Sequence, residues 1–368
     1  MTKSNSHLDA LALSFVPGLA SGGIRAMFDE GYRPREIPEL SDEVLGRYGV
    51  RSRTIASLRS MEPYREEAER QIQKGELEGV HILTLDSPDY PERLRQIWSP
   101  PVALYVRGEL RPEDATAVAI VGTRSATTYG RLSSERYAAR LASCGVTVVS
   151  GLARGIDTWA HREALRVGGR TIAVVASGLD RIQPWTAAEL AGEISSRGAI
   201  ISEYRFGTRA LRPYFPQRNR IISGLSLGVL LVESDVKGGG MITARFAFDH
   251  DRDLFALPGP VTSPKSSGPN MLIRTDRARL TESPDDLMEA LGLRVPDPID
   301  RGEISASVGL SLFEQQVWDV LTGEPLHIDE IASSTGLGPS ELLVALLRLE
   351  FLGLVRQMAG KRFLRMEG

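Results

Sequence analysis

The stretch TAVAIVGTRS, residues 116–125, joins a continuous apolar run to a glycine and an arginine, and a helical segment follows at 129–143. An apolar run without polar alternation is typical of a strand that is buried on both faces. Similar runs recur along 78–292 and alternate with helical segments, so we expect a Rossmann-like, doubly wound, mostly parallel α/β sheet. The expected strands are VHILTL (80–85), VALYVRG (102–108), TAVAIVG (116–122), VTVVS (146–150), TIAVVAS (171–177), AIIS (199–202), LGVLLVE (227–233) and DLFALPG (253–259).

Two smaller segments flank this part of the chain. Residues 1–72 contain LALSFVPGLASGGIRAMFDEG, which predicts two helices around a Pro-Gly turn, as in a SAM-like or helix-hairpin-helix domain. Residues 293–310 are rich in Pro, Gly, Ser and charge and predict a linker. Three helical segments and an alternating hairpin follow in 311–368, which is the pattern of a winged-helix domain.

Composition excludes several classes of protein. The chain has 368 residues, of which 42% are hydrophobic and 25% charged, so it can bury a large core and is not a disordered chain. No apolar run reaches the roughly 18 residues of a membrane span, and the first residues lack the apolar stretch of a signal peptide. We therefore expect a cytoplasmic protein with no membrane association. The single cysteine, Cys144, excludes a disulfide framework and a Cys-based zinc site, and we expect no metal and no cofactor.

Basic residues gather in the middle of the chain. The formal net charge is -3, yet residues 116–260 carry 18 Lys and Arg against 12 Asp and Glu, whereas 311–368 carry 5 against 8. Of the 44 basic residues, 39 are arginine. The planar guanidinium suits phosphate binding and stacking on bases, although coding bias also enriches arginine.

The residues that follow the expected strands favour an anionic ligand. Gly122 and Arg124 follow the first parallel strand, and Arg154 follows the second. Ligands of open α/β sheets bind beyond the carboxyl ends of the strands, where glycine lets the backbone approach them. The stretch GTRSATTYG is not G-x-G-x-x-G, and no acidic residue ends the next strand, so a dinucleotide cofactor is disfavoured.

Two further segments also favour an anionic ligand. Residues 204–220 hold five arginines and four aromatic residues, a combination that single-stranded nucleic acid binding requires. In 233–243, Lys237 precedes three glycines and an expected helix, which predicts a nest of backbone amides beside a positive charge. This is not a P-loop, because no G-K-[ST] occurs there. Four strand ends are therefore expected to meet on one cationic edge.

Seven motifs, in this order, resemble the DprA/Smf family of DNA-processing proteins across the Rossmann-like segment. They are VAIVGTR (118–124), SGLARGIDTWAH (150–161), TIAVVASGLD (171–180), IISEYRFGT (200–208), FPQRNRIISGLS (215–226), KGGGMITA (237–244) and FALPGP (255–260). KGGGMITA has glycine where the family commonly has serine in K-S-G-S-L-I-T-A, and SGLDRIQPWTAAEL has Gln183 in place of the usual tyrosine.

The resemblance implies a protein without catalytic activity that binds and protects single-stranded DNA and loads RecA onto it during natural transformation and recombination. It also implies a homodimer formed through the Rossmann-like domain and work on DNA that single-strand binding protein covers. Phe215 is the candidate for base stacking. Together with the turns described above, the candidate DNA-binding residues are Gly122, Arg124, Ser125, Arg154, Phe215, Arg218, Asn219, Arg220, Lys237, Gly238, Gly239 and Gly240.

Two alternatives remain open. A Rossmann-like nucleotide phosphoribohydrolase would resemble P-G-G-x-G-T-x-x-E, which the stretch Pro258-Gly259-Pro260 does not continue. A transcription regulator would use the winged helix, but the third helical segment of that domain, PSELLVALLRLEFLGLV, contains one arginine and is mostly apolar. A recognition helix needs polar side chains that reach base edges, so partner binding or packing is favoured for this segment.

Overall fold

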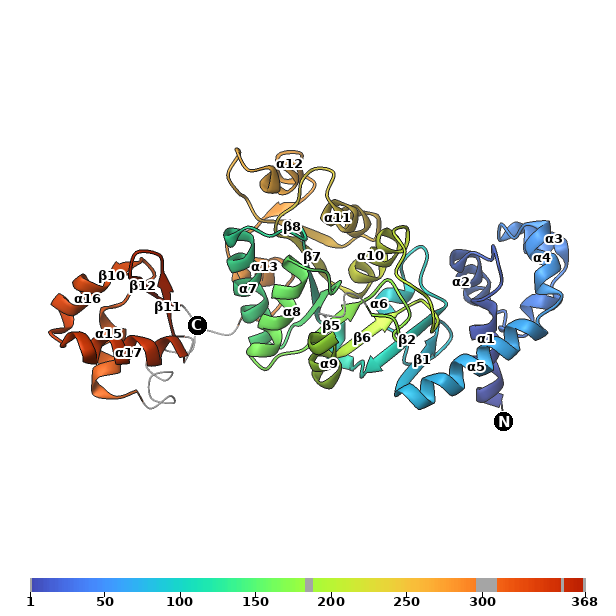
Figure 1. Ribbon diagram of the computed structural model, residues 1–368. Helices are drawn as coiled ribbons and strands as arrows, with labels where there is room; N and C mark the ends of the chain where they lie inside the picture. The colour runs from blue at the N-terminus through green and yellow to red at the C-terminus, as the bar shows by residue number, and fades with distance from the viewer. Residues whose placement is uncertain (1, 183–187, 296–309, 352–353, 367–368) are drawn as a thin grey trace. The chain divides into compact units, whose positions relative to one another are not determined.

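The computed structural model describes residues 2–182, 188–295, 310–351 and 354–366. The chain forms two compact units, Met1–Val295 and Pro296–Gly368 (Figure 1). Most of the expected linker and the Gln183 position lie outside the described residues. No helix of the described ranges is both long enough and apolar enough to cross a bilayer.

The first unit is built around one nine-stranded sheet in its described part, in the order β1-β2-β6-β5-β4-β3-β7-β8-β9. The strands from β3 to β9 pair with one another in parallel. Strand β2 pairs antiparallel with both of its neighbours, β1 and β6. This confirms the mostly parallel sheet. The strands are β1 (Val80–Thr84), β2 (Ala103–Gly108), β3 (Ala117–Val121), β4 (Thr147–Ser150), β5 (Thr171–Val174), β6 (Ala199–Ser202), β7 (Gly228–Leu231), β8 (Asp253–Ala256) and β9 (Arg279–Leu280).

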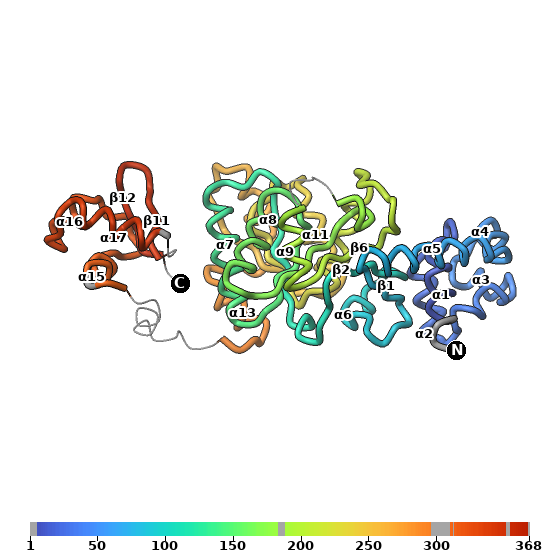
Figure 2. The backbone as a smooth tube through the Cα atoms, turned by 60° about the horizontal axis from the view of Figure 1, so that its bottom comes forward, coloured from blue at the N-terminus to red at the C-terminus, as the bar shows by residue number. Residues whose placement is uncertain are grey.

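Helices cover both faces of this sheet, as the continuous apolar strands predict (Figures 1 and 2). Alternate residues of β3 show the division: Ala119 packs in the cluster with Ile221 of α10, and Ile120 packs in the cluster with Tyr137 of α7. Helices α7 to α9 therefore lie on one face, and α10 and α11 on the other. The helices of this part are α6 (Glu92–Arg95), α7 (Thr128–Ser143), α8 (Ile156–Arg166), α9 (Ala188–Arg197), α10 (Tyr214–Leu225), α11 (Gly239–Asp249), α12 (Ser267–Arg274) and α13 (Pro284–Ala290).

The strand order reverses between β3 and β7. The chain leaves β3 toward α7 on one face and leaves β7 toward α11 on the other, so the two connections diverge at the carboxyl ends of these strands. Ligands of doubly wound sheets bind at such a switch point. The fold thus selects the loops after β3 and β7 as the candidate site.

The N-terminal helices form a cluster of their own within the first unit. Leu11 and Leu13 pack with Ile24 and Met27 across the Pro-Gly turn, in which Gly18 has a φ of 79°. This confirms the expected helical region; its likeness to a SAM-like domain and its boundary at residue 72 stay predictions. The helices are α1 (Thr2–Leu13), α2 (Ser21–Asp29), α3 (Asp42–Arg47), α4 (Ser52–Leu58) and α5 (Glu62–Glu78).

The second unit has the winged-helix arrangement that the sequence predicts. Three helices enclose a core that includes Val317, Ile331 and Leu346, and a three-stranded sheet in the order β10-β12-β11 closes it. Ser311 and Glu314 form a capping box at the start of the first helix. The elements are α15 (Leu312–Val320), α16 (Ile328–Thr335), α17 (Pro339–Phe351), β10 (Leu326–His327), β11 (Val355–Met358) and β12 (Arg362–Arg365).

Candidate nucleic-acid interface

Two glycines allow the loops after β3 and β7 to touch. A Cβ atom on Gly240 would lie 3.4 Å from the Cα of Gly122 and 2.7 Å from a methyl group of Leu231. A Cβ on Gly122 would lie 2.6 Å from Cγ1 of Ile156. The backbone amide of Thr123 donates to the carbonyl oxygen of Glu233 at 2.8 Å and ties the two loops together. The switch point is therefore a close backbone junction rather than an open cleft.

The buried carboxylate of Glu233 fixes the turn that follows β3. Its Oε2 accepts the backbone amide of Thr127 at 2.9 Å, and its Oε1 accepts the Thr127 hydroxyl at 2.5 Å. Thr127 is the N-cap of α7 and accepts the amide of Gly130. Because protein acceptors already engage amides at this helix start, a phosphate would depend on the side chains of the turn rather than on these amides.

Arg124 is the exposed cation of this turn. Its guanidinium carbon lies 5.0 Å from the ring centre of Phe215, the second residue of α10, which comes from the opposite face of the sheet. A cation over an aromatic face is a favourable pair that also fixes both groups. The charge of Arg124 and the half-buried ring of Phe215 therefore lie side by side at the turn after β3.

The turn after β4 packs against the turn after β3. Gly155 has a φ of 93°, and a Cβ atom there would clash with the carbonyl oxygen of Thr123. The exposed Arg154 donates from Nε to the carbonyl oxygen of Arg124 at 3.3 Å. The two arginines that the sequence places after neighbouring strands are therefore adjacent in space.

Lys265 was missed by the sequence analysis. Its ammonium donates to the hydroxyl of Ser125 at 2.7 Å and lies 3.3 Å from that of Thr123. Its carbonyl oxygen accepts the amide of Ser234, next to the loop after β7. Lys265 belongs to a single 3-10 turn beyond the last long strand, so no strand-end pattern in the sequence could have pointed to it.

The loop after β7 adds an exposed lysine beside the glycines. The backbone amide of Lys237 donates to Asp235 Oδ1 at 3.1 Å, and Gly238 is the N-cap of α11. Gly239 has open space where a side chain would be, whereas a Cβ on Gly238 would clash with the Ser234 hydroxyl. In this chain, Ser234 therefore fills the space beside Gly238, one of the positions where the family commonly has serine.

We call the convergent groups the rim. The rim comprises Gly122, Thr123, Arg124, Ser125, Arg154, Gly155, Phe215, Lys237, Gly238, Gly239, Gly240 and Lys265.

Arg218 does not lie exposed on the rim. Only 4% of it is accessible, and its Nη1 donates to the carbonyl oxygen of Val174 at 2.8 Å, behind Gly151. Burial lowers the pKa of the Arg218 guanidinium to about 10, against the opposing effect of Asp157. Burial also raises the pKa of the Asp157 carboxyl, which accepts the amides of Gly151 and Ala153. Arg218 and Asp157 thus brace the turn that carries Arg154.

Arg220 is engaged with protein groups as well. Its guanidinium forms a two-pronged ion pair with Glu203, at 2.6 and 2.7 Å, and its Nε donates to the carbonyl oxygen of Ser99. Asn219, between the two arginines, is half-buried. The FPQRNR motif suggests free arginine side chains, but Arg218 and Arg220 both bond to protein groups. Direct DNA contact by Arg218, Asn219 and Arg220 stays a prediction.

His161, on α8, is fully buried. His161 Nδ1 lies 2.6 Å from the hydroxyl of Thr171, and burial lowers its pKa to about 3. Within the described ranges, no group of three His, Cys, Asp or Glu side chains could hold a metal ion.

Comparison with known proteins identifies the family of the chain. Residues 81–292 match the family model of DNA recombination-mediator protein A, and residues 305–361 match that of the DprA winged helix domain. Protein Smf of Escherichia coli is 38% identical over 285 residues, which are 76% of each chain. DNA processing protein DprA of Bacillus subtilis is 36% identical over 215 residues, 58% of this chain and 72% of the relative.

Solved structures give the same result. DNA processing protein A of Streptococcus pneumoniae superposes with a TM-score of 0.67 at 31% identity, over 78% of this chain and 98% of that one. The protein of the same name from Helicobacter pylori, described by its single-stranded DNA binding mode, gives a TM-score of 0.53 at 31% identity, over 58% of this chain and 95% of that one. Fold, domain order and sequence all agree, and the chain belongs to the DprA/Smf family of DNA processing proteins.

Proposed function

We propose that this protein binds single-stranded DNA along the rim. The observation that carries the proposal is the convergence of three strand-end turns with Lys265 and Phe215 at the switch point of the sheet. Arg124, Arg154 and Lys237 supply exposed cations for phosphates. The nearby carboxylate of Glu233 is buried and accepts two donors of Thr127, so it presents little charge to a ligand.

The aromatic residues favour a single strand over a duplex. Phe215 lies beneath the Arg124 guanidinium, so the same point offers a ring for a base and a charge for its phosphate. Behind it, Tyr204 and Tyr214 stack with ring centres 4.4 Å apart. Unpaired bases stack on such rings, whereas bases in a duplex already stack on one another.

Arg218 and Arg220 would act as positioning residues. Arg218 holds α10 against the ends of β4 and β5, and Arg220 holds the same helix to Glu203 after β6. Both therefore fix the helix that presents Phe215. Their effect on DNA binding would come through the rim, not through a phosphate contact.

In the described part of the second unit, α17 does not have the chemistry of a usual recognition helix. The exposed side chains of α17 include Leu343, Val344 and Leu347, which cannot read base edges by hydrogen bonding. This supports a non-sequence-specific role for the protein. The phosphoribohydrolase alternative gains no support either, because the backbone of Gly259 is closed onto the side-chain amide of Asn270.

We further infer that the protein protects incoming DNA and loads RecA onto it during natural transformation and recombination, acting as a homodimer of its Rossmann-like domain. Family membership supports this role, since the matching family model describes a recombination mediator. The test is RecA assembly on a single strand coated with single-strand binding protein. Acceleration by the wild-type protein is expected, and sedimentation should give twice the monomer mass. A monomer that leaves RecA assembly unchanged would contradict this inference.

The binding proposal is tested by measuring affinity for poly-dT, duplex DNA and single-stranded RNA at several salt concentrations. Arg124→Ala and Lys237→Ala should each weaken poly-dT binding and lower the slope of log affinity against log salt by about 0.7, the value for one lost phosphate contact. Arg70→Ala, an exposed arginine on α5, is the control and should bind like the wild type. Equal slopes for all four proteins, or preference for duplex DNA, would reject the rim as the single-strand site.

A further inference from the structure

The outward face of α8 continues the basic character of the rim. The helix begins directly after Arg154 and Gly155 and carries Trp159, Arg162 and Arg166 at spacings of three and four residues. Residues at this spacing share one face of a helix. At 1.5 Å per residue, Ile156 and Arg166, the two ends of α8, are about 15 Å apart along the helix. The basic side chains thus form a line that leads away from the rim.

Trp159 packs against two arginines, one from α7 and one from α8. The guanidinium carbon of Arg131, from the first turn of α7, is 4.0 Å from the ring centre of Trp159, and that of Arg162 is 5.6 Å from it. The acidic partner of Arg131, Glu135, has a side chain only 14% exposed, whereas the arginine is 46% exposed. Both cations are therefore exposed, and the half-buried ring of Trp159 packs against them.

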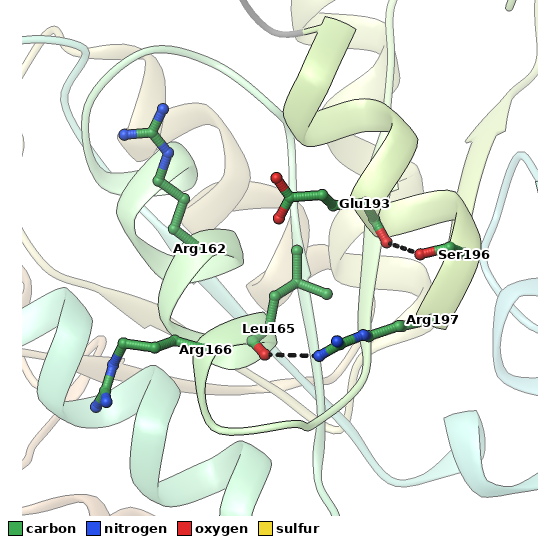
Figure 3. Close-up of a pocket in the computed structure, with 6 residues that line it drawn as sticks. All are labelled: Arg162, Leu165, Arg166, Glu193, Ser196 and Arg197. Atoms are coloured by element: carbon green, nitrogen blue, oxygen red, sulfur yellow. Dashed lines mark hydrogen bonds between the residues drawn. The ribbon is translucent and has the colours of Figure 1, made fainter. Parts of the chain in front are cut away.

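The line ends at a hollow of about 460 Å³ between α8 and α9 (Figure 3). Arg197 crosses from α9 and donates to the carbonyl oxygen of Leu165 at 3.1 Å, which fixes its direction. Arg166 pairs with Glu163, but its side chain is 62% exposed and that of the glutamate only 16%. The lining residues are Arg162, Leu165, Arg166, Glu193, Ser196 and Arg197.

We propose that a single strand bound at the rim continues over Trp159 into the hollow between α8 and α9, so that the protein has a second, sequence-independent segment of its binding path. We call this segment, made by Arg131, Trp159, Arg162, Arg166 and Arg197, the α8 track. The proposal rests on the proposed function of the rim. The α8 track would contact only those strands that are long enough to extend beyond the rim. A strand that only fills the rim would make no contact with it.

The order of the groups favours a nucleic acid over an acidic peptide. Cation, ring and cation follow one another along the track, which matches the alternation of phosphate and base in an unpaired strand. An acidic peptide offers carboxylates for the arginines but no repeated flat surface for Trp159. Arginine in this setting also stacks on bases, which lysine does not do as well.

The test uses the full chain with Arg162→Glu/Arg166→Glu and oligothymidylates from about 4 to about 16 nucleotides, the range of single-strand site sizes. The shortest strands that bind the wild type should bind the double variant equally well. The longer strands should lose the affinity that the wild type gains with length, and their salt slope should fall by about 1.4, for two contacts of about 0.7 each.

The control is Arg70→Glu on α5. Arg70 has the same 62% side-chain exposure as Arg166 and the same pairing, 2.7 Å from a glutamate three residues earlier. It therefore reproduces, away from the track, the charge change and the broken ion pair of the Arg166→Glu substitution. A second readout is tryptophan fluorescence: long strands should quench it in the wild type and quench it less in Trp159→Phe, while short strands should not distinguish the two proteins.

The outcomes separate the two proposals. Loss of binding at all lengths in the double variant with an intact fold, or an unchanged length dependence, would overturn the α8 track and leave the rim in place. Capture of an aspartate-rich peptide by the wild type, lost in the double variant while DNA binding is kept, would assign the track to a protein partner instead. A wild-type protein that binds no oligothymidylate would overturn both. Should the double variant fail to fold, Arg166→Gln and Trp159→Phe give the same length test.

Discussion

Replacing Arg218 distinguishes a buried brace from a phosphate contact. In Arg218→Ala, the carboxylate of Asp157 stays buried without its neighbouring positive charge, and the carbonyl oxygen of Val174 loses its donor. Breaking a buried opposite-charge arrangement typically costs about 3–5 kcal/mol of folding free energy. Because two backbone amides already bond to Asp157, we expect a loss near the lower end, about 3 kcal/mol.

A second variant locates the origin of this loss. Arg218→Met keeps most of the side-chain volume and removes the charge, so it should remain strongly destabilised through Asp157. The double variant Arg218→Met/Asp157→Asn removes both charges together and should recover part of the stability. A coupling energy of about 0.5–3 kcal/mol between the two sites is expected, as for neighbouring residues of one charged network.

The assays are urea unfolding and poly-dT titration at several salt concentrations. Arg218→Ala should unfold at lower urea, and its folded fraction should keep the wild-type salt slope. If the variant instead unfolds like the wild type and its slope falls by about 0.7, Arg218 contacts a phosphate directly and the positioning role is wrong.

Three other predictions concern the glycines after β7, Glu233 and His161. Gly238→Ser should destabilise the loop after β7, because its Cβ meets a neighbouring serine hydroxyl, whereas Gly239→Ser should be tolerated; thermal melts compare them. Glu233→Gln keeps an acceptor for Thr127 but removes the charge-assisted bonds, and should lower the unfolding free energy by about 1–2 kcal/mol in urea titrations. His161 has a folded pKa of about 3 against 6.5 unfolded, so stability is retained above pH 6.5 and falls as pH drops toward 3, by at most about 1.4 kcal/mol per pH unit. Stability curves of the wild type and His161→Phe between pH 7 and pH 4 should therefore differ in slope, and parallel curves would contradict this assignment.

Much of the fold follows from short-range patterns. The apolar runs predict the eight longer strands of the first unit with both ends within three residues, because a strand buried on both faces has a composition that few other elements share. The antiparallel pairing of β1 and β2 could not be deduced from the sequence. The relative direction of two paired strands depends on the path of the chain that connects them, and not on the residues of either strand.

The candidate site is harder to read from sequence. Arg124 and Arg218 are both arginines in glycine- or aromatic-rich stretches, yet one is exposed and the other is buried behind Gly151. The difference arises from the packing of α10 against strand ends distant in the chain, which a local pattern does not contain. The same holds for the ion pair between Arg220 and Glu203.

The junction between Gly122 and Gly240 has a consequence for synthesis of the protein. The two glycines are neighbours in space but belong to loops separated along the chain by more than a third of the first unit, and Lys265 comes later still. Contacts of such long sequence separation form late and slowly. A chain emerging from the ribosome therefore has no assembled rim until Lys265 has left the exit tunnel, so nascent chains should not capture DNA strands.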